Sequence, residues 1–212
     1  TPISQSIPAA AAVVYETGAV DEYSVSFDPN TANKFVIAYR DPQDSANNYQ
    51  GKVIVGTISG TTLSFGTPVN LANVSNATSD IAVAFDPNTA NKFVVAYRDE
   101  SNSHYGSTQV GTVSGTSISF SSVVVFLSAI TREIKISFDP NTSGKFVLSY
   151  YNQTSGSRGE AIIGTLSGTT TSFGSGVVFN SSTSTRNSLA FDPNTAGKFV
   201  ITFRNGGNSN AG

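Results

Sequence analysis

The chain has 212 residues and a formal net charge of −2, and only 12% of its residues are charged. Phosphate groups and anionic membrane surfaces are bound by clustered Lys and Arg, so this composition predicts neither a nucleic-acid-binding protein nor a membrane-surface protein. The sequence contains no Cys, which excludes disulfides, cysteine-ligated metals and thiol nucleophiles.

The N-terminal region shows neither a membrane span nor a signal peptide. No apolar run of the sequence approaches the roughly 20 residues that a bilayer span requires, and the run at residues 123–127 is strand-sized. The sequence begins at Thr1, contains no Met and has no basic segment ahead of an apolar one. We therefore interpret it as a processed chain or a piece of a longer one. Residues 1–21 are expected to form the last strand of a preceding unit, because residues 11–27 align without a gap to 122–138.

A nearly identical segment then recurs four times along the chain. The copies read SVSFDPNTANKFVIAYRD from Ser24, AVAFDPNTANKFVVAYRDE from Ala82, KISFDPNTSGKFVLSYYN from Lys135 and SLAFDPNTAGKFVITFRN from Ser188. Their Phe residues before the D-P-N sequence, Phe27, Phe85, Phe138 and Phe191, are 58, 53 and 53 residues apart. A period in this range indicates a propeller, a solenoid or another repeat array. We divide the single repeat domain, 1–212, into units at about 22–79, 80–132, 133–185 and a partial unit at 186–212.

Each unit is predicted to begin with a strand and a tight turn. Apolar and polar residues alternate over 23–27, which is the period of a strand. The D-P-N sequence that follows is typical of a turn, because Pro presets φ and the Asp and Asn side chains bond to their own backbone. One Asp per turn is too few for a calcium loop, which supplies several carboxylates. We therefore assign a structural turn role to the repeated residues Asp28, Asn30, Asp86, Asn88, Asp139, Asn141, Asp192 and Asn194.

Three further strands are predicted in each complete unit. In the first unit these are 35–40, which is largely apolar on both faces, then 53–58, and then 63–65 continuing toward Leu71. A strand that is apolar on both faces is expected to be buried on both sides. No segment has the 3.6-residue apolar period of a helix. The predicted fold is therefore all-β, made of tandem four-stranded antiparallel meanders that are propeller-like or, as the alternative, an open linear stack.

The fourth copy contains only its first two strands. By comparison with the third unit, its third strand would begin at position 214, just past Gly212. The N-terminal strand could join this copy and close a ring, or the open edge could accept a strand from another chain. The sequence could also be a window from a longer array, and it leaves these three alternatives open.

Candidate chemistry is sparse, and no catalytic residue, cofactor or metal ligand is predicted. His104 is the only His, so a hydrolytic triad or a His-ligated metal site lacks partners. There is no Trp for sugar stacking, and the carboxylates Asp44, Glu100, Glu133 and Glu160 fall at unmatched places in the units. The arginines that end the second strands, Arg40, Arg98 and Arg204, are expected to form repeated ion pairs.

The loops between the second and third strands differ most between the copies. Variable loops on a constant scaffold are where binding normally occurs. The loop residues predicted to contact a ligand are Tyr49, His104, Tyr105 and Arg158.

The succession FDPNTANKFVVAYRD, a polar loop, VGTVSGTSISF and VVVF resembles tandem repeats in uncharacterised, tail-fibre-like proteins of aquatic microbes and their phages. The resemblance covers nearly the whole chain. It implies an extracellular or virion-associated repeat protein, and it carries over no catalytic residues.

These observations favour a non-enzymatic structural subunit of an extracellular filament, surface appendage or virion fibre that self-associates into a homopolymer. The alternative is a lectin-like β-propeller that binds surface glycans through the variable loops. An enzyme is the least favoured class, because it would need one asymmetric site that breaks the repeat.

Overall fold

The computed structural model describes residues 12–42, 49–71 and 77–208. These residues form strands and turns and no helix, which confirms the all-β prediction. Within these segments there is accordingly no helix of the length and apolarity that crossing a membrane requires.

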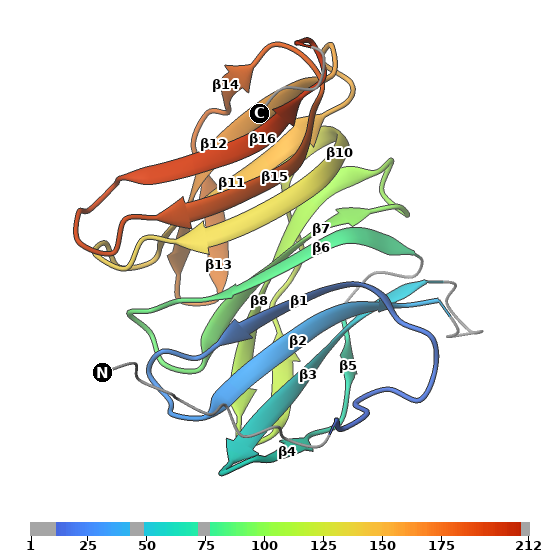
Figure 1. The fold of residues 1–212 in the computed structure, drawn as a ribbon, viewed down its shortest axis with the longest axis vertical. Helices are drawn as coiled ribbons and strands as arrows, with labels where there is room; N and C mark the ends of the chain where they lie inside the picture. Colours follow the sequence, from blue (N-terminus) through green and yellow to red (C-terminus); the bar gives the residue numbers. More distant parts are fainter. Residues whose placement is uncertain (1–11, 43–48, 72–76, 209–212) are drawn as a thin grey trace, which may run out of the picture.

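Successive strands pair antiparallel within each unit (Figure 1). Unit 1 contains β1 (Asp21–Phe27), β2 (Lys34–Asp41), β3 (Gln50–Ser59), β4 (Thr62–Phe65) and β5 (Val69–Asn70). Unit 2 contains β6 (Thr78–Phe85), β7 (Lys92–Asp99), β8 (Tyr105–Ser114), β9 (Ser117–Phe120) and the start of β10 (Val124–Phe138). Unit 3 contains the end of β10, β11 (Lys145–Asn152), β12 (Arg158–Ser167), β13 (Thr170–Phe173) and β14 (Val177–Asn180), and unit 4 contains β15 (Ser184–Phe191) and β16 (Phe199–Asn205).

The fourth strand of each complete unit is broken into two pieces. In unit 1, β4 and β5 both pair with β3, and in unit 3, β13 and β14 both pair with β12. In unit 2 the second piece is the start of β10, which pairs with β8 and then runs on to pair with β11 as the first strand of unit 3. Strand β10 therefore joins units 2 and 3 into one sheet of nine strands.

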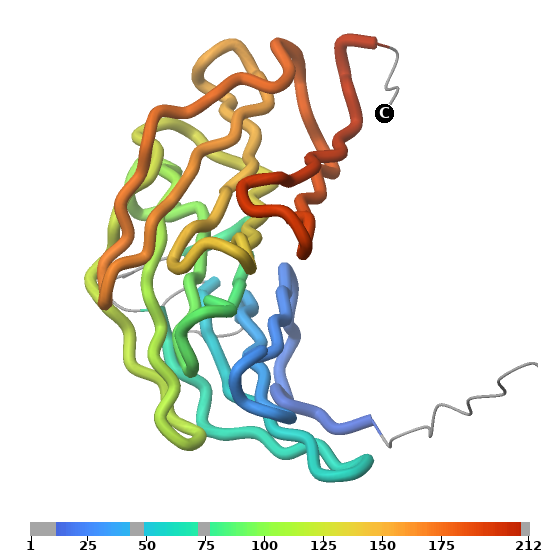
Figure 2. Tube along the Cα trace, turned by 90° about the vertical axis from the view of Figure 1, so that its left-hand side faces the viewer, coloured from blue at the N-terminus to red at the C-terminus, as the bar shows by residue number. Residues whose placement is uncertain are grey.

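The first strands of the four units lie side by side around one axis, in the order β1, β6, the end of β10 and β15. Figure 2 shows that the units follow a curve. The described residues therefore form an arc of blade-like sheets, and they do not close into a ring.

Two layers of buried side chains hold the first three units together, and β7 contributes to both. Phe93, Val95 and Tyr97 belong to the layer shared with unit 1, and Val94 and Ala96 belong to the layer shared with unit 3. All five side chains are fully buried, which confirms that a second strand with two apolar faces is covered on both sides. Burying each large apolar side chain contributes about 1.5–3 kcal/mol, so these shared layers are the main stabilising force between units.

A glycine of the third strand faces the Phe that lies near the start of the second strand in each complete unit. The pairs are Phe35 with Gly56, Phe93 with Gly111 and Phe146 with Gly164. A Cβ atom on these glycines would lie 2.1, 2.0 and 2.2 Å from the Cζ atom of the paired ring. The ring occupies the space that any other side chain would need, and this fixes the register of the two strands.

The D-P-N turns are closed by their Asp side chains. Oδ1 of Asp28 accepts a hydrogen bond from the backbone N–H of Asn30 at 2.9 Å, and the equivalent bonds of the other three turns measure 2.9, 2.9 and 2.8 Å. Oδ2 of Asp28 accepts from the N–H of Asn91 at 3.1 Å, and Oδ2 of Asp139 accepts from the N–H of Gly197 at 2.8 Å. One carboxylate thus closes its own turn and also bonds to the turn of the next unit.

The segment ahead of β1 packs in the place of a fourth strand without forming one. Residues 12–20 contain no strand. Tyr15 nevertheless packs against Tyr39 and Phe65, with ring centroids 5.3 and 5.8 Å apart. Phe126 packs on the equivalent rings of unit 3 at the same 5.3 and 5.8 Å. Tyr15 therefore makes the same ring contacts as Phe126, although among the described residues there is no third strand with which the backbone of Tyr15 could pair.

Candidate functional site

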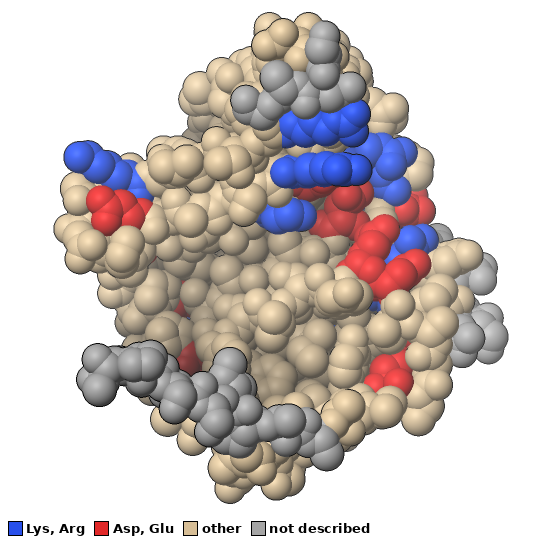
Figure 3. Space-filling model, viewed as in Figure 1, with Lys and Arg blue, Asp and Glu red and all other residues tan. Residues whose placement is uncertain are grey.

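Charged side chains gather at the end of the units where each first strand begins and each second strand ends, which we call the charged end. They lie along one side of the face shown in Figure 3. The variable loops leave the same end, because each loop directly follows a second strand. This end therefore holds the residues that the sequence predicted as ligand contacts.

A bulge near the start of each first strand organises the charged end. The pairing of first and second strands shifts register there in all four units. The bulged residues adopt positive φ without being glycine: Glu22 at 48°, Asp80 at 54°, Glu133 at 55° and Arg186 at 54°. A non-glycine residue in this region costs on the order of 1–3 kcal/mol, so other interactions must hold the bulge in place.

The bulged carboxylates supply those interactions by bonding from unit to unit. Glu22 Oε2 accepts the backbone N–H of Asp80. Oδ1 of Asp80 accepts the N–H of Glu133 at 2.8 Å, and Oε2 of Glu133 accepts the N–H of Arg186 at 3.0 Å. The series ends at Arg186, which has no carboxylate. The acidic residues of this row therefore join the units. Glu22, Asp80 and Glu133 each lie five residues before the Phe of their D-P-N turn (27−22, 85−80 and 138−133), so the expectation that Glu133 falls at an unmatched place in its unit is wrong.

The arginines at the ends of the second strands pair with these carboxylates. Arg40 lies 3.2 Å from Glu22, and Arg98 lies 3.5 Å from Asp80 and 2.6 Å from Glu100. The ion pairs predicted for these two arginines are therefore present. Burial raises the pKa of Glu22. Burial alone would also raise the pKa of Glu100, but hydrogen bonds from Arg98 and a neighbouring Ser outweigh it and lower that pKa.

The structure does not bring the predicted ligand-contact residues together. Tyr49 adopts positive φ, and its ring stacks under the guanidinium of Arg40 of its own unit at 4.3 Å. His104 is exposed and adjoins Tyr105 at the start of β8. The Nε atom of Arg158 lies 2.5 Å from Glu160, two residues further along β12. Each residue is held within its own unit, so in the described part of the chain these loops form no common pocket, and their role as ligand contacts stays a prediction.

The charged end offers little for catalysis in the described residues. No group of three or more His, Cys, Asp or Glu side chains there is arranged to hold a metal ion. Its bulged carboxylates are engaged by backbone N–H groups and, in two units, by arginines. This geometry is that of a structural joint.

An apolar trough lies between unit 3 and the hairpin of unit 4. Ile163 of β12 and Val177 of β14 form its floor, and they are 55% and 65% exposed. Phe199 and Ile201 of β16 form its wall. The space between floor and wall has a volume of about 230 Å³.

Among the described residues, unit 4 contributes two strands beside this trough, whereas each of the other units contributes more. Ile163 corresponds to Val55 and Val110, which are 0% and 2% exposed and belong to the two buried layers between units. Val200 of β16 is 64% exposed, whereas its counterpart Val94 is fully buried.

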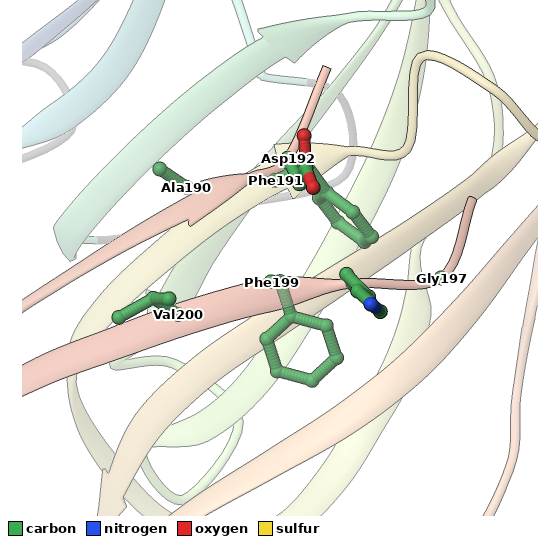
Figure 4. Close-up of a pocket in the computed structure, with 7 residues that line it drawn as sticks. Ala190, Phe191, Asp192, Gly197, Phe199 and Val200 are labelled. Atoms are coloured by element: carbon green, nitrogen blue, oxygen red, sulfur yellow. The ribbon is translucent and has the colours of Figure 1, made fainter. Parts of the chain in front are cut away.

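Two further hollows lie beside the first strands. The outer face of the unit 4 hairpin carries a hollow of about 570 Å³, lined by Ala190, Phe191, Phe199 and Val200 with Asp192 beside them (Figure 4). A groove of about 450 Å³ follows the common axis and is lined by equivalent residues of all four units, among them the Phe residues that precede the D-P-N turns. The described surface is thus polar and internally bonded at the charged end, and apolar along the open sheet faces.

No family model matches the chain, and no curated protein matches it by sequence. Among solved structures, the fold is similar to Sqt1 from Chaetomium thermophilum. Two structures of Sqt1 align with TM-scores of 0.53 and 0.55 at 17% and 16% identity, covering 80% and 83% of this chain and 39% of Sqt1. A third, Sqt1 bound to the N-terminus of the ribosomal protein L10, aligns with a TM-score of 0.52 at 14% identity, covering 82% of this chain and 41% of Sqt1. The chain therefore spans about two-fifths of the length of Sqt1, and the likeness concerns the fold.

This comparison overturns the function predicted from the sequence. The similar structures are of Sqt1, and one of them holds a segment of a different protein. The predictions of a fibre subunit that self-associates, of an extracellular or virion-associated location, and of a lectin-like binder of surface glycans are therefore wrong.

Proposed function

We propose that this chain is a non-enzymatic module that binds an extended segment of another protein. The observation that carries the proposal is the groove of about 450 Å³ that follows the common axis and is lined by residues of all four units, where Val25 and Phe27 are 61% and 55% exposed. Contiguous exposed apolar surface on a folded domain is typical of a protein-interaction site.

Two other findings support a binding role over a catalytic one. The carboxylates of the charged end are engaged in bonds between units, as in the pair of Glu133 with the N–H of Arg186 at 3.0 Å, and this leaves them as scaffold. The similar fold of Sqt1 has been solved with the N-terminus of ribosomal protein L10 bound, which is a precedent for this fold holding a chain segment.

Panning a random peptide library against the folded chain tests the proposal. We expect enriched peptides that bind the purified chain with micromolar affinity, measured by isothermal titration calorimetry, and that lose binding when the chain is unfolded in urea. The proposal is wrong if no sequence is enriched over a bare support, or if the enriched peptides bind the unfolded chain equally well.

A further inference from the structure

We infer that the part of the charged end formed by units 3 and 4 binds acidic side chains of the partner segment. We call this part the basic cluster, and it consists of Arg132, Lys135, Arg186 and Arg204. The inference rests on the proposed function and deepens it. It assigns a chemistry to one end of the segment whose apolar residues lie in the groove along the common axis, which we call the axial groove.

The charged end changes sign from one half of the arc to the other. In units 3 and 4 the starts of the first strands and the ends of the second strands carry the four cationic side chains of the basic cluster and one carboxylate, that of Glu133. On the right of Figure 3, blue side chains gather over units 3 and 4, and red ones lie below them, toward units 1 and 2. In units 1 and 2 the same positions carry two arginines among the carboxylates Asp21, Glu22, Asp41, Asp80, Asp99 and Glu100. A local excess of positive charge favours association with anionic groups.

Arg204 lacks the carboxylate that its counterparts have, because of a residue change inside unit 4. Arg40 pairs at 3.2 Å with Glu22, the bulged residue of its own first strand. The bulged residue of the first strand in unit 4 is Arg186. In the described part of the chain no carboxylate lies within ion-pair distance of Arg204. The ion pair predicted for Arg204 is therefore absent there, and two arginines stand where unit 1 has an ion pair.

The cations of the cluster are available to an anionic partner. Arg132, Lys135 and Arg186 are exposed. Nε of Arg132 donates to the amide oxygen of Gln153 at 2.9 Å, and Nζ of Lys135 donates to a backbone carbonyl at 3.2 Å, so the acceptors of both are uncharged. Like charges held together repel one another. Carboxylates that bind here therefore relieve this repulsion and also form charge-assisted hydrogen bonds, which arginine makes in a bidentate geometry.

The basic cluster lies on the same strands as the axial groove. Arg186 precedes the groove residue Leu189 by three positions in β15, and Glu133 precedes the groove residue Ile136 by three positions in β10. At about 3.3 Å per residue of strand, the cluster is roughly 10 Å from the groove. An extended segment with apolar side chains in the groove therefore reaches the cluster with residues about three positions further along.

The axial groove favours an acidic peptide over a nucleic acid as the partner. Its lining consists of Val, Ile, Leu, Phe, Ala, Pro and Ser residues, none of them charged. A nucleic acid needs a row of cations along its phosphate backbone, whereas a peptide needs them only where its acidic residues lie. The class of partner segment is thus an apolar stretch followed by a short run of Asp or Glu.

Two fluorescent peptides, V-P-F-V-G-S-E-E-E-E and V-P-F-V-G-S-Q-Q-Q-Q, are the probes, and their binding to the full chain is measured by fluorescence anisotropy. We expect the dissociation constant of the glutamate peptide to be about tenfold lower than that of the glutamine peptide. This difference should shrink as the salt concentration rises, because salt screens exposed charges.

Arg186→Glu is the variant that tests the cluster. It gives unit 4 the residue that units 1 and 3 have at this bulge, Glu22 and Glu133, and so supplies Arg204 with a carboxylate. We expect it to abolish the preference for the glutamate peptide without lowering the free energy of unfolding. The matched control is Lys198→Glu, the same change of charge at an exposed residue of the same unit, beside the D-P-N turn and outside the cluster; it should keep the preference.

The outcomes separate this inference from the proposed function. If both probes bind with equal affinity, or if only library peptides without acidic residues bind, the basic cluster is not an acidic-segment site and the proposal of segment binding stands. If neither the probes nor any library peptide binds, both proposals are wrong. An equal loss of preference in Lys198→Glu would show a general effect of charge and overturn the assignment to the cluster. Displacement of the glutamate peptide by oligothymidylate at an equal or lower concentration would also overturn it, in favour of a phosphate backbone.

Discussion

Asp139 of the third D-P-N turn bonds to the turn of the next unit through its carboxylate, which accepts the N–H of Gly197. Burial alone would raise the pKa of Asp139, but hydrogen bonds from the N–H of Asn141, the hydroxyl of Thr142 and the N–H of Gly197 outweigh it and hold that pKa below its ordinary value. The folded state therefore favours the carboxylate. Its contribution to stability is present above the unfolded pKa of about 3.9 and is lost as the pH falls through the lower folded pKa.

We therefore predict that Asp139→Asn makes the free energy of unfolding depend less on pH in the acidic range. The parent chain should lose free energy of unfolding as the pH drops below about 4, and the variant should lose less over the same interval. Urea unfolding at a series of pH values measures this. An acid limb of equal slope in the two proteins would show that Asp139 carries no part of the pH dependence.

At Gly111 the ring of Phe93 determines which residue is tolerated. A Cβ there would lie 2.0 Å from the Cζ atom of that fully buried ring. We predict that Gly111→Ala lowers the free energy of unfolding by about 1–3 kcal/mol, as overpacking of a core typically does. Gly174→Ala is the control, because the nearest atom to its added Cβ is a carbonyl oxygen at 3.9 Å. Equal effects of the two substitutions in urea unfolding would contradict this explanation.

At the level of strands, the sequence predicted most of the architecture because the repeat shows each element several times. Alternation over 23–27 and the double-faced apolar pattern of 35–40 match β1 and β2 closely. The bulges could not be predicted, because residues such as Glu22 and Asp80 adopt positive φ without being glycine. Their conformation is selected by carboxylate bonds between units that are far apart in sequence. The continuous β10 was also not evident, because it depends on pairing with both β8 and β11.

The candidate site was missed for a different physical reason. Phe199 and Val200 have the same residue types as Phe93 and Val94, so their sequence indicates a core strand. Whether such residues are buried depends on which strands pack over them, and in unit 4 those strands are not present among the described residues. The local sequence pattern specifies a strand and its apolar face, whereas the exposure of that face depends on whether a neighbouring unit covers it.

The hairpin β15–β16 should be the least stable element of the described fold. Among the described residues no third strand pairs with it, and Val200 is 64% exposed where Val94 is fully buried. Regions with few buried contacts open at lower free energy than the core. We predict that backbone amides of β15 and β16 exchange with deuterium faster than those of β6 and β7, measured by mass spectrometry. Equal protection of the two hairpins would contradict this prediction.

For the whole molecule, the question is whether units joined in an arc unfold together or one by one. Repeat proteins are stabilised by interactions within units and between neighbours, and they unfold as one when the coupling between neighbours is strong. Here β10 runs from unit 2 into unit 3, and β7 gives one apolar face to each of the two buried layers. These shared strands should couple units 1 to 3 into a single cooperative transition.

Substituting one buried residue of unit 3 tests this coupling. Leu148 of β11 is fully buried in the layer between units 2 and 3, and Leu148→Ala should cost about 2–5 kcal/mol. If the units are coupled, hydrogen exchange in moderate urea will show amides of β2, in unit 1, losing protection together with those of β7 and β11. Val25→Ala, at an exposed site in unit 1, should change the free energy of unfolding by no more than about 0.5 kcal/mol. If β2 keeps the protection that it has in the parent chain while β11 loses protection, the units unfold separately. The shared strands then hold the units in register but do not make them unfold cooperatively.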